Sequence, residues 1–379
     1  MKSDKTTPNV PTLRFKQYHC PWSTYHLSDI AEVVGGGTPD TTVSSLWNGD
    51  IQWFTPTEVG HQKYVSKSAR TITQLGLQKS SAKKLPAGSI LLSSRATIGE
   101  CSIAQRECTT NQGFQNLIPK KDTNNEFLYY LAQTKKHHFI KYASGSTFLE
   151  ISNSEIKKTK CTVPGTEEQT QIAAFLSALD DRIAVQNKII SKYETLIKGL
   201  CNMIFPSIEG SILPLKAIVS IEKGQQINGM LLAKTGKYYY LNGGIAPSGY
   251  IDDYNTSEET ISISEGGNSC GFVSYNLQKF WSGGHCYTLK IMAEQCRSKY
   301  LFFYLKYKEK NIMQLRVGSG LPNIQKKSLE NFNVKLPNYK KQCFVERIFE
   351  VVTAKKEIEN ALLERFQSQK KFLLSKMFI

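Results

Sequence analysis

Hydrophobic side chains recur at alternating steps of four and three residues between residues 166 and 206. A helix with this spacing carries them along one side, and a seam longer than about four heptads is typical of a coiled coil. Such a helix of about 38 residues would be nearly 60 Å long, at about 1.5 Å per residue, which exceeds most helices that cover only their own domain's core. Gln186 interrupts the row. The predicted seam residues are Ile172, Leu176, Leu179, Ile183, Ile190, Tyr193, Ile197, Leu200 and Ile204.

The start of this helix is marked by polar residues. Thr166 and Gln169 have the spacing of a capping box, in which each side chain bonds a backbone N–H at the helix start. Glu167 and Glu168 are favourable at the positive end of a helix. We therefore expect the helix to begin at Thr166.

A second long helix is predicted over residues 338–379. Its stripe is less regular, because Lys355, Lys356 and Glu359 interrupt it. One such helix alone would expose a hydrophobic face, whereas two helices in one chain can bury each other. The predicted seam of this helix includes Ile348, Val352, Ile358, Leu362 and Phe366, with Phe344 and Phe372 on the same stripe.

Before each long helix lies strand-prone sequence rich in Gly, Ser, Thr and aromatic residues, followed by a short helix. The short helices are predicted over residues 126–143 and 299–315. A glycine turn follows each one, "YASGSTFLEIS" from Tyr142 and "RVGSGLPNIQ" from Arg316. The predicted order of elements is thus the same in both halves of the chain.

The two halves also repeat in sequence. The turn residues Gly145 and Ser146 match Gly318 and Ser319, 173 residues later, and the match continues without a gap from Leu128 to Phe205. Upstream, the match shifts and the second copy is shorter. A shared frame around a divergent stretch is typical of one scaffold with two recognition surfaces. Two copies are too few for a solenoid.

These patterns predict an α+β chain with two pseudo-twofold-related recognition domains, separated by two long α-helices packed as an antiparallel coiled coil. The predicted boundaries are 1–22 for a leader, 23–165 for the first domain, 166–206 for the central helix, 207–337 for the second domain and 338–379 for the last helix.

Composition favours a polyanionic partner. The chain has 48 Lys and Arg against 32 Asp and Glu, a formal charge of +16. It has no secretory signal and no apolar run long enough to span a membrane, which together predict a cytoplasmic protein. None of the nine Cys forms a CxxC pair, so free thiols are expected. A zinc site at Cys101, Cys108, His137 and His138 would be the weak alternative.

Motifs of common catalysts are missing. There is no GxxxxGK[ST] loop, no GxSxG elbow and no HExxH helix, and Gly35–Gly37 lacks the context of a phosphate-binding loop. The acid pairs at Asp180 and Asp252 have the pattern of solvated side chains rather than an acid/base pair. The sequence therefore predicts neither enzyme activity nor a metal site in this chain.

Two stretches without acids predict contact with nucleic acid. Residues 59–99 contain seven Lys and Arg and residues 231–250 contain Lys234 and Lys237, whereas neither stretch contains Asp or Glu, and both lie where the two copies differ most. Basic side chains suit phosphates, and Arg, Asn, Gln and Tyr suit base edges. A solubilising basic surface is the alternative. The candidate DNA-binding residues are Lys63, Lys67, Arg70, Lys83, Lys84, Arg95, Lys234, Lys237, Tyr239 and Lys279.

The whole pattern resembles the specificity (S) subunits of type I restriction-modification systems. The resemblance covers nearly the whole chain. It is carried by "LSDIAEVVGGGTP" at Leu27, "SSRATIG" at Ser93, "SGSTFLEIS", "VGSGLPNI" and "IAAFLSALDDRIAVQNKII" at Ile172. The shorter second domain and the polar breaks in the last helix depart from the family pattern.

The resemblance implies a non-catalytic DNA-binding subunit. Each target recognition domain would read one half of a bipartite double-stranded DNA target. The helices would set the spacing and hold two methyltransferase (M) subunits, and restriction (R) subunits would join them. S-adenosylmethionine would belong to the M subunits, and ATP and Mg to the R subunits. Alternatives are a two-headed DNA-binding regulator and a split type II restriction-modification specificity partner.

Overall fold

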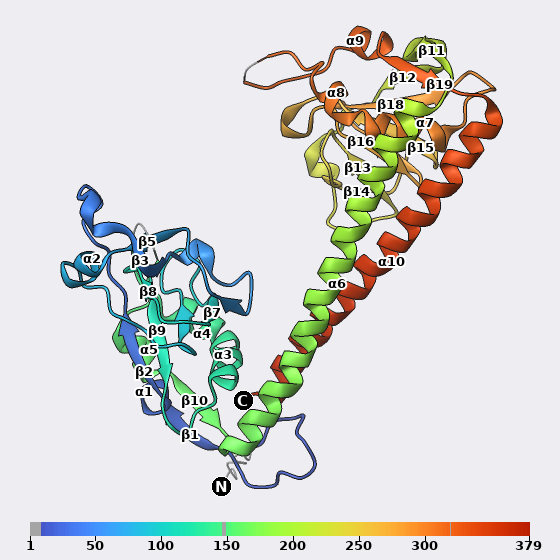
Figure 1. Cartoon of the computed structure of the whole chain (residues 1–379). Coiled ribbons are helices and arrows are strands. Elements are labelled where there is room, and N and C mark those ends of the chain that lie inside the picture. Colours follow the sequence, from blue (N-terminus) through green and yellow to red (C-terminus); the bar gives the residue numbers. More distant parts are fainter. Residues whose placement is uncertain (1–8, 146–148, 319) are drawn as a thin grey trace. The chain divides into compact units, whose positions relative to one another are not determined.

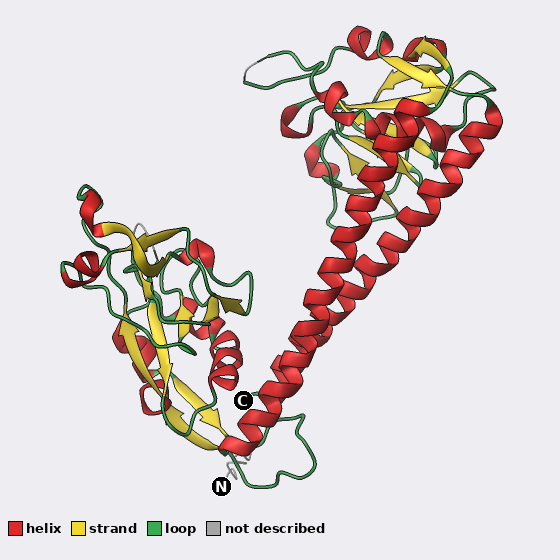
Figure 2. Ribbon diagram, in the orientation of Figure 1, coloured by secondary structure: helices red, strands yellow, loops and turns green. Residues whose placement is uncertain are grey.

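The chain folds into two compact units, each built of sheets and helices (Figure 1, Figure 2). The computed structural model describes residues 9–145, 149–318 and 320–379. Unit 1 contains residues 1–187 and 361–379, and unit 2 contains residues 188–360. Each unit therefore includes one part of each long helix. The α+β class predicted from the sequence is confirmed.

The larger sheets of the two units share the order of four strands. In unit 1 the order is β2 (Ala31–Gly35), β9 (Gln115–Pro119), β6 (Ile90–Leu92), β7 (Cys101–Ala104) and β4 (Tyr64–Val65). In unit 2 it is β12 (Val219–Lys223), β18 (Cys286–Ile291), β15 (Thr260–Ser264) and β16 (Val273–Asn276). The first four strands of unit 1 are paired antiparallel, as are the four of unit 2.

Each unit also has a small three-stranded sheet. The order is β5 (Arg70–Ile72), β3 (Trp47–Phe54) and β8 (Thr109–Thr110) in unit 1, and β14 (Gly249–Ile251), β13 (Tyr238–Leu241) and β17 (Phe280–Ser282) in unit 2. In both sheets the central strand has an antiparallel neighbour on one side and a parallel neighbour on the other.

A two-stranded ladder closes each unit next to its long helix. Strand β1 (Ser23–His26) pairs with β10 (Lys160–Val163), and β11 (Ser211–Pro214) pairs with β19 (Asn333–Leu336). Both ladders are antiparallel. The smaller helices are α1 (Leu27–Ile30), α2 (Gln74–Gln78), α5 (Asn153–Lys158) and α9 (Lys326–Glu330), with 3₁₀ turns at Ser44–Leu46, Pro56–Glu58, Leu215–Ala217, Gly229–Leu231 and Gly267–Ser269.

Each predicted short helix is in fact two helices. In unit 1, α3 (Asn125–Thr134) is followed by α4 (Lys136–Lys141), and in unit 2, α7 (Ser298–Tyr307) is followed by α8 (Glu309–Met313). The breaks fall at Lys135 and Lys308, matching positions whose ψ angles of 1° and 8° depart from helical geometry. Propensity alone does not reveal these breaks, because the residues on both sides favour helix.

The long helices are α6 (Thr166–Ser207) and α10 (Tyr339–Met377), and they run antiparallel where they pack in each unit. In unit 1, Asp180 forms an ion pair with Lys370 at 2.6 Å. In unit 2, Glu194 forms one with Lys356 at 2.9 Å, and the ring of Phe205 stacks on Phe349 at 5.5 Å. Within the described residues, no helix is long and apolar enough to span a membrane.

The seam predicted on α10 is partly wrong. Ile358 is 66% exposed, so it lies outside the seam, and the flanking Phe344 and Phe372 are exposed as well. The buried side chains near the start of the helix are instead Val345 and Phe349, one residue further along. The stripe was misjudged because polar Lys356 and Lys370 occupy its inner side, where they pair with acids of α6. The predicted residues of α6 and the other predicted residues of α10 are buried or half-buried.

The start of α6 differs from the predicted capping box. The Thr166 hydroxyl donates to the backbone oxygen of Asp122, so it is not directed at the helix N–H groups. The Gln169 side chain accepts from Asn124 N at 2.9 Å and donates to the oxygens of Asp122 and Pro164 at 3.3 and 2.9 Å. These polar side chains therefore fasten the helix to the loop before α3.

Candidate nucleic-acid interface

The small sheet of unit 1 holds Arg70 against two tryptophans. The guanidinium carbon of Arg70 lies 3.6 Å from the ring centre of Trp47 and 5.7 Å from that of Trp53. The two indoles pack edge to face at 5.0 Å and are buried. A guanidinium over an aromatic face is held by cation–π attraction. Arg70 is therefore an exposed charge on a rigid base.

Both tryptophans are anchored by backbone oxygens in or just after the glycine run. Trp53 Nε1 donates to the Gly37 oxygen at 2.8 Å, and Trp47 Nε1 donates to the Asp40 oxygen at 2.9 Å. A Cβ atom added to Gly36 would lie 1.9 Å from the Asn111 oxygen. Gly36 thus allows close packing of the backbone at this point.

A bulge next to these tryptophans exposes polar residues. Trp47 and Ile51 both pair with Ile72, so the intervening residues of β3 leave the ladder. Asn48 in this bulge has a φ of 62°, a left-handed conformation that Asn tolerates better than most residues. Bulges re-aim side chains at the edges of sheets. Asn48 and Asp50 are exposed beside the Arg70 site.

The small sheet of unit 2 carries an aromatic and basic row of its own. Lys237 Nζ lies 5.2 Å from the ring centre of Tyr238, whose ring lies 5.0 Å from that of Tyr254. Lys279 Nζ lies 4.5 Å from the Tyr254 ring and donates to the Tyr254 hydroxyl at 3.2 Å. This hydrogen bond raises the pKa of Lys279 above its usual value, so its ammonium group stays charged. Two cations and two rings therefore line one sheet.

Tyr239, a predicted contact residue, faces the interior instead. Its ring stacks on Phe280 at 5.2 Å, and its hydroxyl donates to Asn276 Oδ1 at 3.0 Å. Burial raises the pKa of Tyr239 to about 12. Alternation along β13 explains the difference, because successive side chains of a strand point to opposite faces. Its neighbour Tyr238 is the one that lies beside the lysines.

Three predicted basic residues have carboxylate partners from outside the acid-free stretch. The side chain of Lys63 is 9% exposed and pairs with Glu126 at 3.1 Å, while its ammonium also donates to Ser177. Lys84 pairs with Glu107 at 2.7 Å, and Arg95 pairs with Glu150. The stretch from 59 to 99 is therefore free of acids in sequence but not in space. Lys63 in particular is a structural residue of unit 1.

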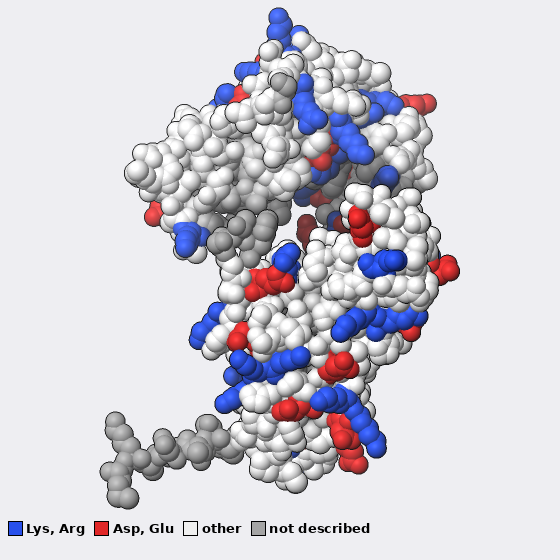
Figure 3. Space-filling model, turned by 90° about the vertical axis from the view of Figure 1, so that its left-hand side faces the viewer, with Lys and Arg blue, Asp and Glu red and all other residues white. Residues whose placement is uncertain are grey.

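The remaining predicted lysines are exposed. Lys67, Lys83 and Lys234 have no ion-pair partner among the described residues. Lys83 lines a hollow of about 590 Å³ together with Lys120 and Lys157. The structure thus brings Arg70 together with tryptophans and Lys237 with Lys279, but it leaves Lys67, Lys83 and Lys234 as separate charges. On the face drawn in Figure 3, Lys and Arg are interspersed with Asp and Glu.

The paired glycine turns have the same construction. Ser144 bridges Glu150 across the first turn, and Val317 bridges Asn323 across the second. Gly145 and Gly318 have φ angles of 134° and 97°, which favour glycine. Beyond each turn, Ile151 N donates to the Ser94 oxygen and Ile324 N to the Glu265 oxygen. The predicted turn residues Ser146 and Ser319 lie outside the described residues.

Sequence reasoning missed Trp47, Trp53, Tyr238 and Tyr254 as parts of these surfaces. A usable signal was present, since aromatic residues flank basic ones in both stretches. It was hidden because Trp47 lies over 20 residues before Arg70 and is brought to it by strand pairing.

Metal and disulfide sites are lacking in the part of the chain that the structure describes. No group of three His, Cys, Asp or Glu side chains there could hold a metal ion. All nine cysteines are free thiols. Burial raises the pKa of Cys101 and of Cys108 to about 12, so these thiols stay protonated near neutral pH. The weak zinc alternative is not supported, because Cys101, Cys108, His137 and His138 form no such group of ligands.

The sequence is similar to those of type I restriction enzyme specificity subunits. A 178-residue segment is 42% identical to the type I restriction enzyme MjaIX specificity subunit of Methanocaldococcus jannaschii, covering 45% of this chain and 41% of that protein. The EcoprrI specificity subunit of Escherichia coli is 23% identical over 348 residues, covering 86% of each chain. The chain spans less than half the length of the first curated relatives it matches.

A solved structure has the same fold. The crystal structure of the S subunit of the type I restriction-modification system from M. genitalium superposes with a TM-score of 0.68 at 19% identity, covering 98% of this chain and 99% of that one. The family model of the type I restriction modification DNA specificity domain matches twice, over residues 20–195 and 212–367. The first match falls mainly in unit 1 and the second mainly in unit 2, and this chain belongs to the type I restriction modification DNA specificity domain family.

Proposed function

We propose that this chain is the sequence-specific DNA-binding specificity subunit of a type I restriction-modification enzyme. In this proposal, each unit reads one half of a bipartite target in double-stranded DNA. One observation carries it: a single strand order is repeated in two units, whose corresponding small sheets present different sets of basic and aromatic side chains. Two scaffolds with different surfaces suit two different half-sites.

The side chains of the small sheets suit DNA in two ways. Arg70 is held over tryptophan rings, so little conformational entropy is lost when its guanidinium binds the edge of a guanine or a phosphate. Lys237 and Lys279 are point charges suited to the DNA backbone. We place the base contacts of unit 1 at Arg70 and the bulge residue Asn48, and the phosphate contacts of unit 2 at the two lysines.

The long helices would serve assembly. We propose that they set the spacing between half-sites and dock two methyltransferase subunits, to which restriction subunits add. S-adenosylmethionine would be bound by the methyltransferase subunits, and ATP and Mg by the restriction subunits. This chain would itself be non-catalytic and act in the cytoplasm.

The test is methylation of DNA by the chain together with its methyltransferase partner. Both genes are expressed in a host that lacks methylation, and methylated bases are mapped by long-read sequencing. The proposal expects one split, asymmetric motif that is methylated only when both proteins are present. If the methyltransferase methylates the same motif alone, the proposal is wrong.

Two assays with the purified chain separate the alternatives. A two-headed regulator would bind its sequence tightly without a methyltransferase, which a gel shift with the isolated chain would reveal. A split type II partner would cleave DNA with a divalent metal in the absence of ATP.

A further inference from the structure

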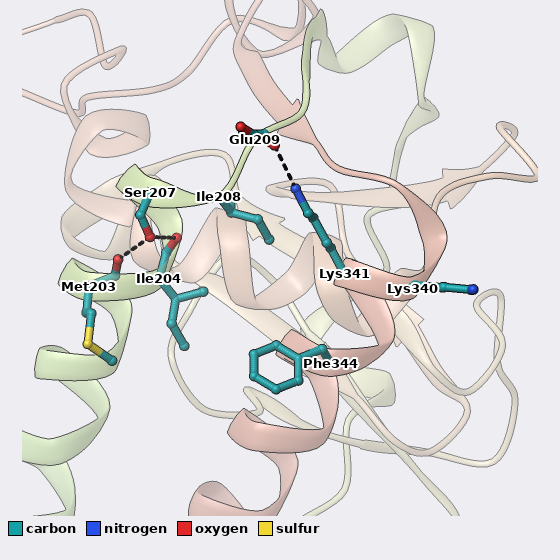
Figure 4. A pocket seen from close by; sticks show the side chains of 8 residues that line it. All are labelled: Met203, Ile204, Ser207, Ile208, Glu209, Lys340, Lys341 and Phe344. Carbon is teal, nitrogen blue, oxygen red and sulfur yellow. Dashed lines mark hydrogen bonds and ion pairs between the residues drawn. The ribbon is translucent and has the colours of Figure 1, made fainter.

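An apolar groove lies in unit 2 between the end of α6 and the start of α10. It encloses about 510 Å³ and is lined by Met203, Ile204, Ser207, Ile208, Glu209, Lys340, Lys341 and Phe344 (Figure 4). Met203 is 63% exposed and Phe344 is 64% exposed. Lys341 reaches toward Glu209, with which it forms an ion pair at 3.0 Å. Large apolar side chains exposed together mark a binding surface.

The corresponding place in unit 1 is covered by the chain itself. Residues 9–22, called here the leader segment, run across the start of α6 and the end of α10. Arg14 forms two hydrogen bonds of 2.7 Å to the carboxylate of Glu168. Phe15 packs edge to face on Phe175 at 5.8 Å, and Leu13 N donates to the Lys376 oxygen at 2.9 Å. The leader segment thus contacts this site through an ion pair, an aromatic contact and a backbone hydrogen bond.

The repeat relates the two places residue by residue. At the spacing of 173 residues, Glu168 corresponds to Lys341, Gln171 to Phe344, and Met203 to Lys376. In unit 1 these positions contact the leader segment, since Gln17 also bonds Gln171 at 2.7 Å. In unit 2 the same positions line the groove. The groove is therefore the unit 2 equivalent of an occupied binding surface.

The path of the chain explains why unit 2 lacks such a cover. The segment that leads into β1 is the leader itself, whereas the segment that leads into β11 comes directly from α6. Helix α6 ends at Ser207 and β11 begins at Ser211. Those few residues are used to turn the corner and cannot fold back across the helix pair. The connection from α6 to β11 therefore supplies no cover for the groove, and a cover would have to come from elsewhere.

The charges at the groove indicate the chemistry of that cover. In unit 1 an acidic residue of α6, Glu168, binds a basic leader residue. In unit 2 the matching residue is Lys341 and its neighbour is Lys340, and the first turn of α10 has no acid. A positive helix end with two lysines favours a carboxylate. The leader segment of a second copy is disfavoured, because it would place Arg14 opposite Lys341.

We infer that this groove binds an extended segment of a partner protein, which places an aromatic or large aliphatic side chain against Phe344 and a carboxylate beside Lys341. The inference rests on the geometry of the two units and holds whichever target the units read. The incoming carboxylate would exchange with Glu209, whose pair with Lys341 is exposed and therefore weak.

Two fluorescent peptides test the inference on the full chain. Both have the sequence of residues 9–22 with Cys20→Ser; the basic peptide has no other change, and the acidic peptide also carries Arg14→Glu. Fluorescence anisotropy measures their binding. The acidic peptide should bind about tenfold more tightly than the basic peptide, because its charge complements Lys341. The variant Lys341→Glu should reverse this preference, and Phe344→Ala should weaken binding of the acidic peptide about tenfold.

A matched control is Lys355→Glu, an exposed charge on α10 outside the groove, which should keep the original preference. Circular dichroism shows whether the variants fold, and all three changed side chains are exposed or half-buried. The inference is overturned if the acidic peptide shows no saturable binding up to about 1 mM. It is equally overturned if Lys341→Glu leaves the preference unchanged.

Discussion

Gln169 and Gln342 make the same three hydrogen bonds, each within its own unit. Gln342 accepts from Arg297 N at 2.9 Å and donates to the oxygens of Gln295 and Pro337 at 2.9 and 2.8 Å. Its partners lie 173 residues after Asn124, Asp122 and Pro164, the partners of Gln169. Both amides are buried. The repeat therefore preserves a polar joint between the long helix and the loop before the short helices.

Replacing Gln342 by Leu should open this joint in unit 2. The N–H of Arg297 and the two carbonyls would be left without a partner, and each unpaired buried group costs about 1–3 kcal/mol. Amide hydrogen exchange should become faster at Arg297 and its neighbours, with no change at Asn124. Gln169→Leu should instead speed exchange at Asn124 and leave exchange at Arg297 unchanged. Gln367→Leu, at an exposed position, is the control. If all three variants changed amide exchange equally, the two glutamines would not form such joints.

Arg70→Ala should weaken DNA binding through unit 1. Loss of one guanidinium at a base edge costs about 1–3 kcal/mol, or about tenfold or more in affinity. Binding is measured by anisotropy with the assembled enzyme and its target duplex. Lys84→Ala is the control, because Lys84 already pairs with Glu107. If Lys84→Ala weakened binding as much as Arg70→Ala, the placement of the interface on the small sheet would be wrong.

Lys237→Ala combined with Lys279→Ala should lower the salt dependence of DNA binding. Each phosphate contact contributes about 0.9 to the slope of log affinity against log salt, so the double variant should reduce that slope by about 2. Lys356→Ala, which removes the partner of Glu194 on the helices, should leave the slope unchanged. An unchanged slope in the double variant would remove these lysines from the interface.

The buried thiols predict which cysteines are alkylated first and how stability changes with pH. Exposed Cys20 should be alkylated first near pH 8, while Cys101 and Cys108 react only after unfolding. Burial raises the pKa of both thiols from 9.0 to about 12, so the folded state holds their protons more tightly than the unfolded state. Their contribution to stability is complete below pH 9 and is lost as the pH rises toward 12.

Mass spectrometry after alkylation and thermal melting across pH 8 to 11 check these expectations. Rapid modification of Cys101 in the folded protein would show that the interior of unit 1 is open.

Much of the fold could be predicted because the hydrophobic periodicity and the internal repeat indicate the same elements. The start of α6 at Thr166 follows from a hydrophobic row and polar residues, and the shared order of elements follows from the 173-residue repeat. The stripe on α10 was displaced, because Lys356 and Lys370 point inward to acids of α6. A hydrophobic pattern cannot identify an inward-facing charge whose partner lies far away in sequence.

The candidate site was harder to predict for the same reason. Lys63 lies in a stretch without acids, yet Glu126 reaches it from α3. Arg70 is exposed, and the rings beneath it come from another strand, so the sequence around it does not reveal them. Charge counts along the sequence show where basic residues are concentrated, while pairing across the fold determines which cations face solvent.

The most direct test of the central claim is a domain exchange followed by methylation mapping. Residues 23–165 are replaced by the corresponding residues of another specificity subunit, and the chimera is expressed with the original methyltransferase. Two independent readers predict that one half of the methylated motif changes while the other half stays as before. A change in both halves, or an unchanged motif, would contradict the claim that each unit reads its own half-site.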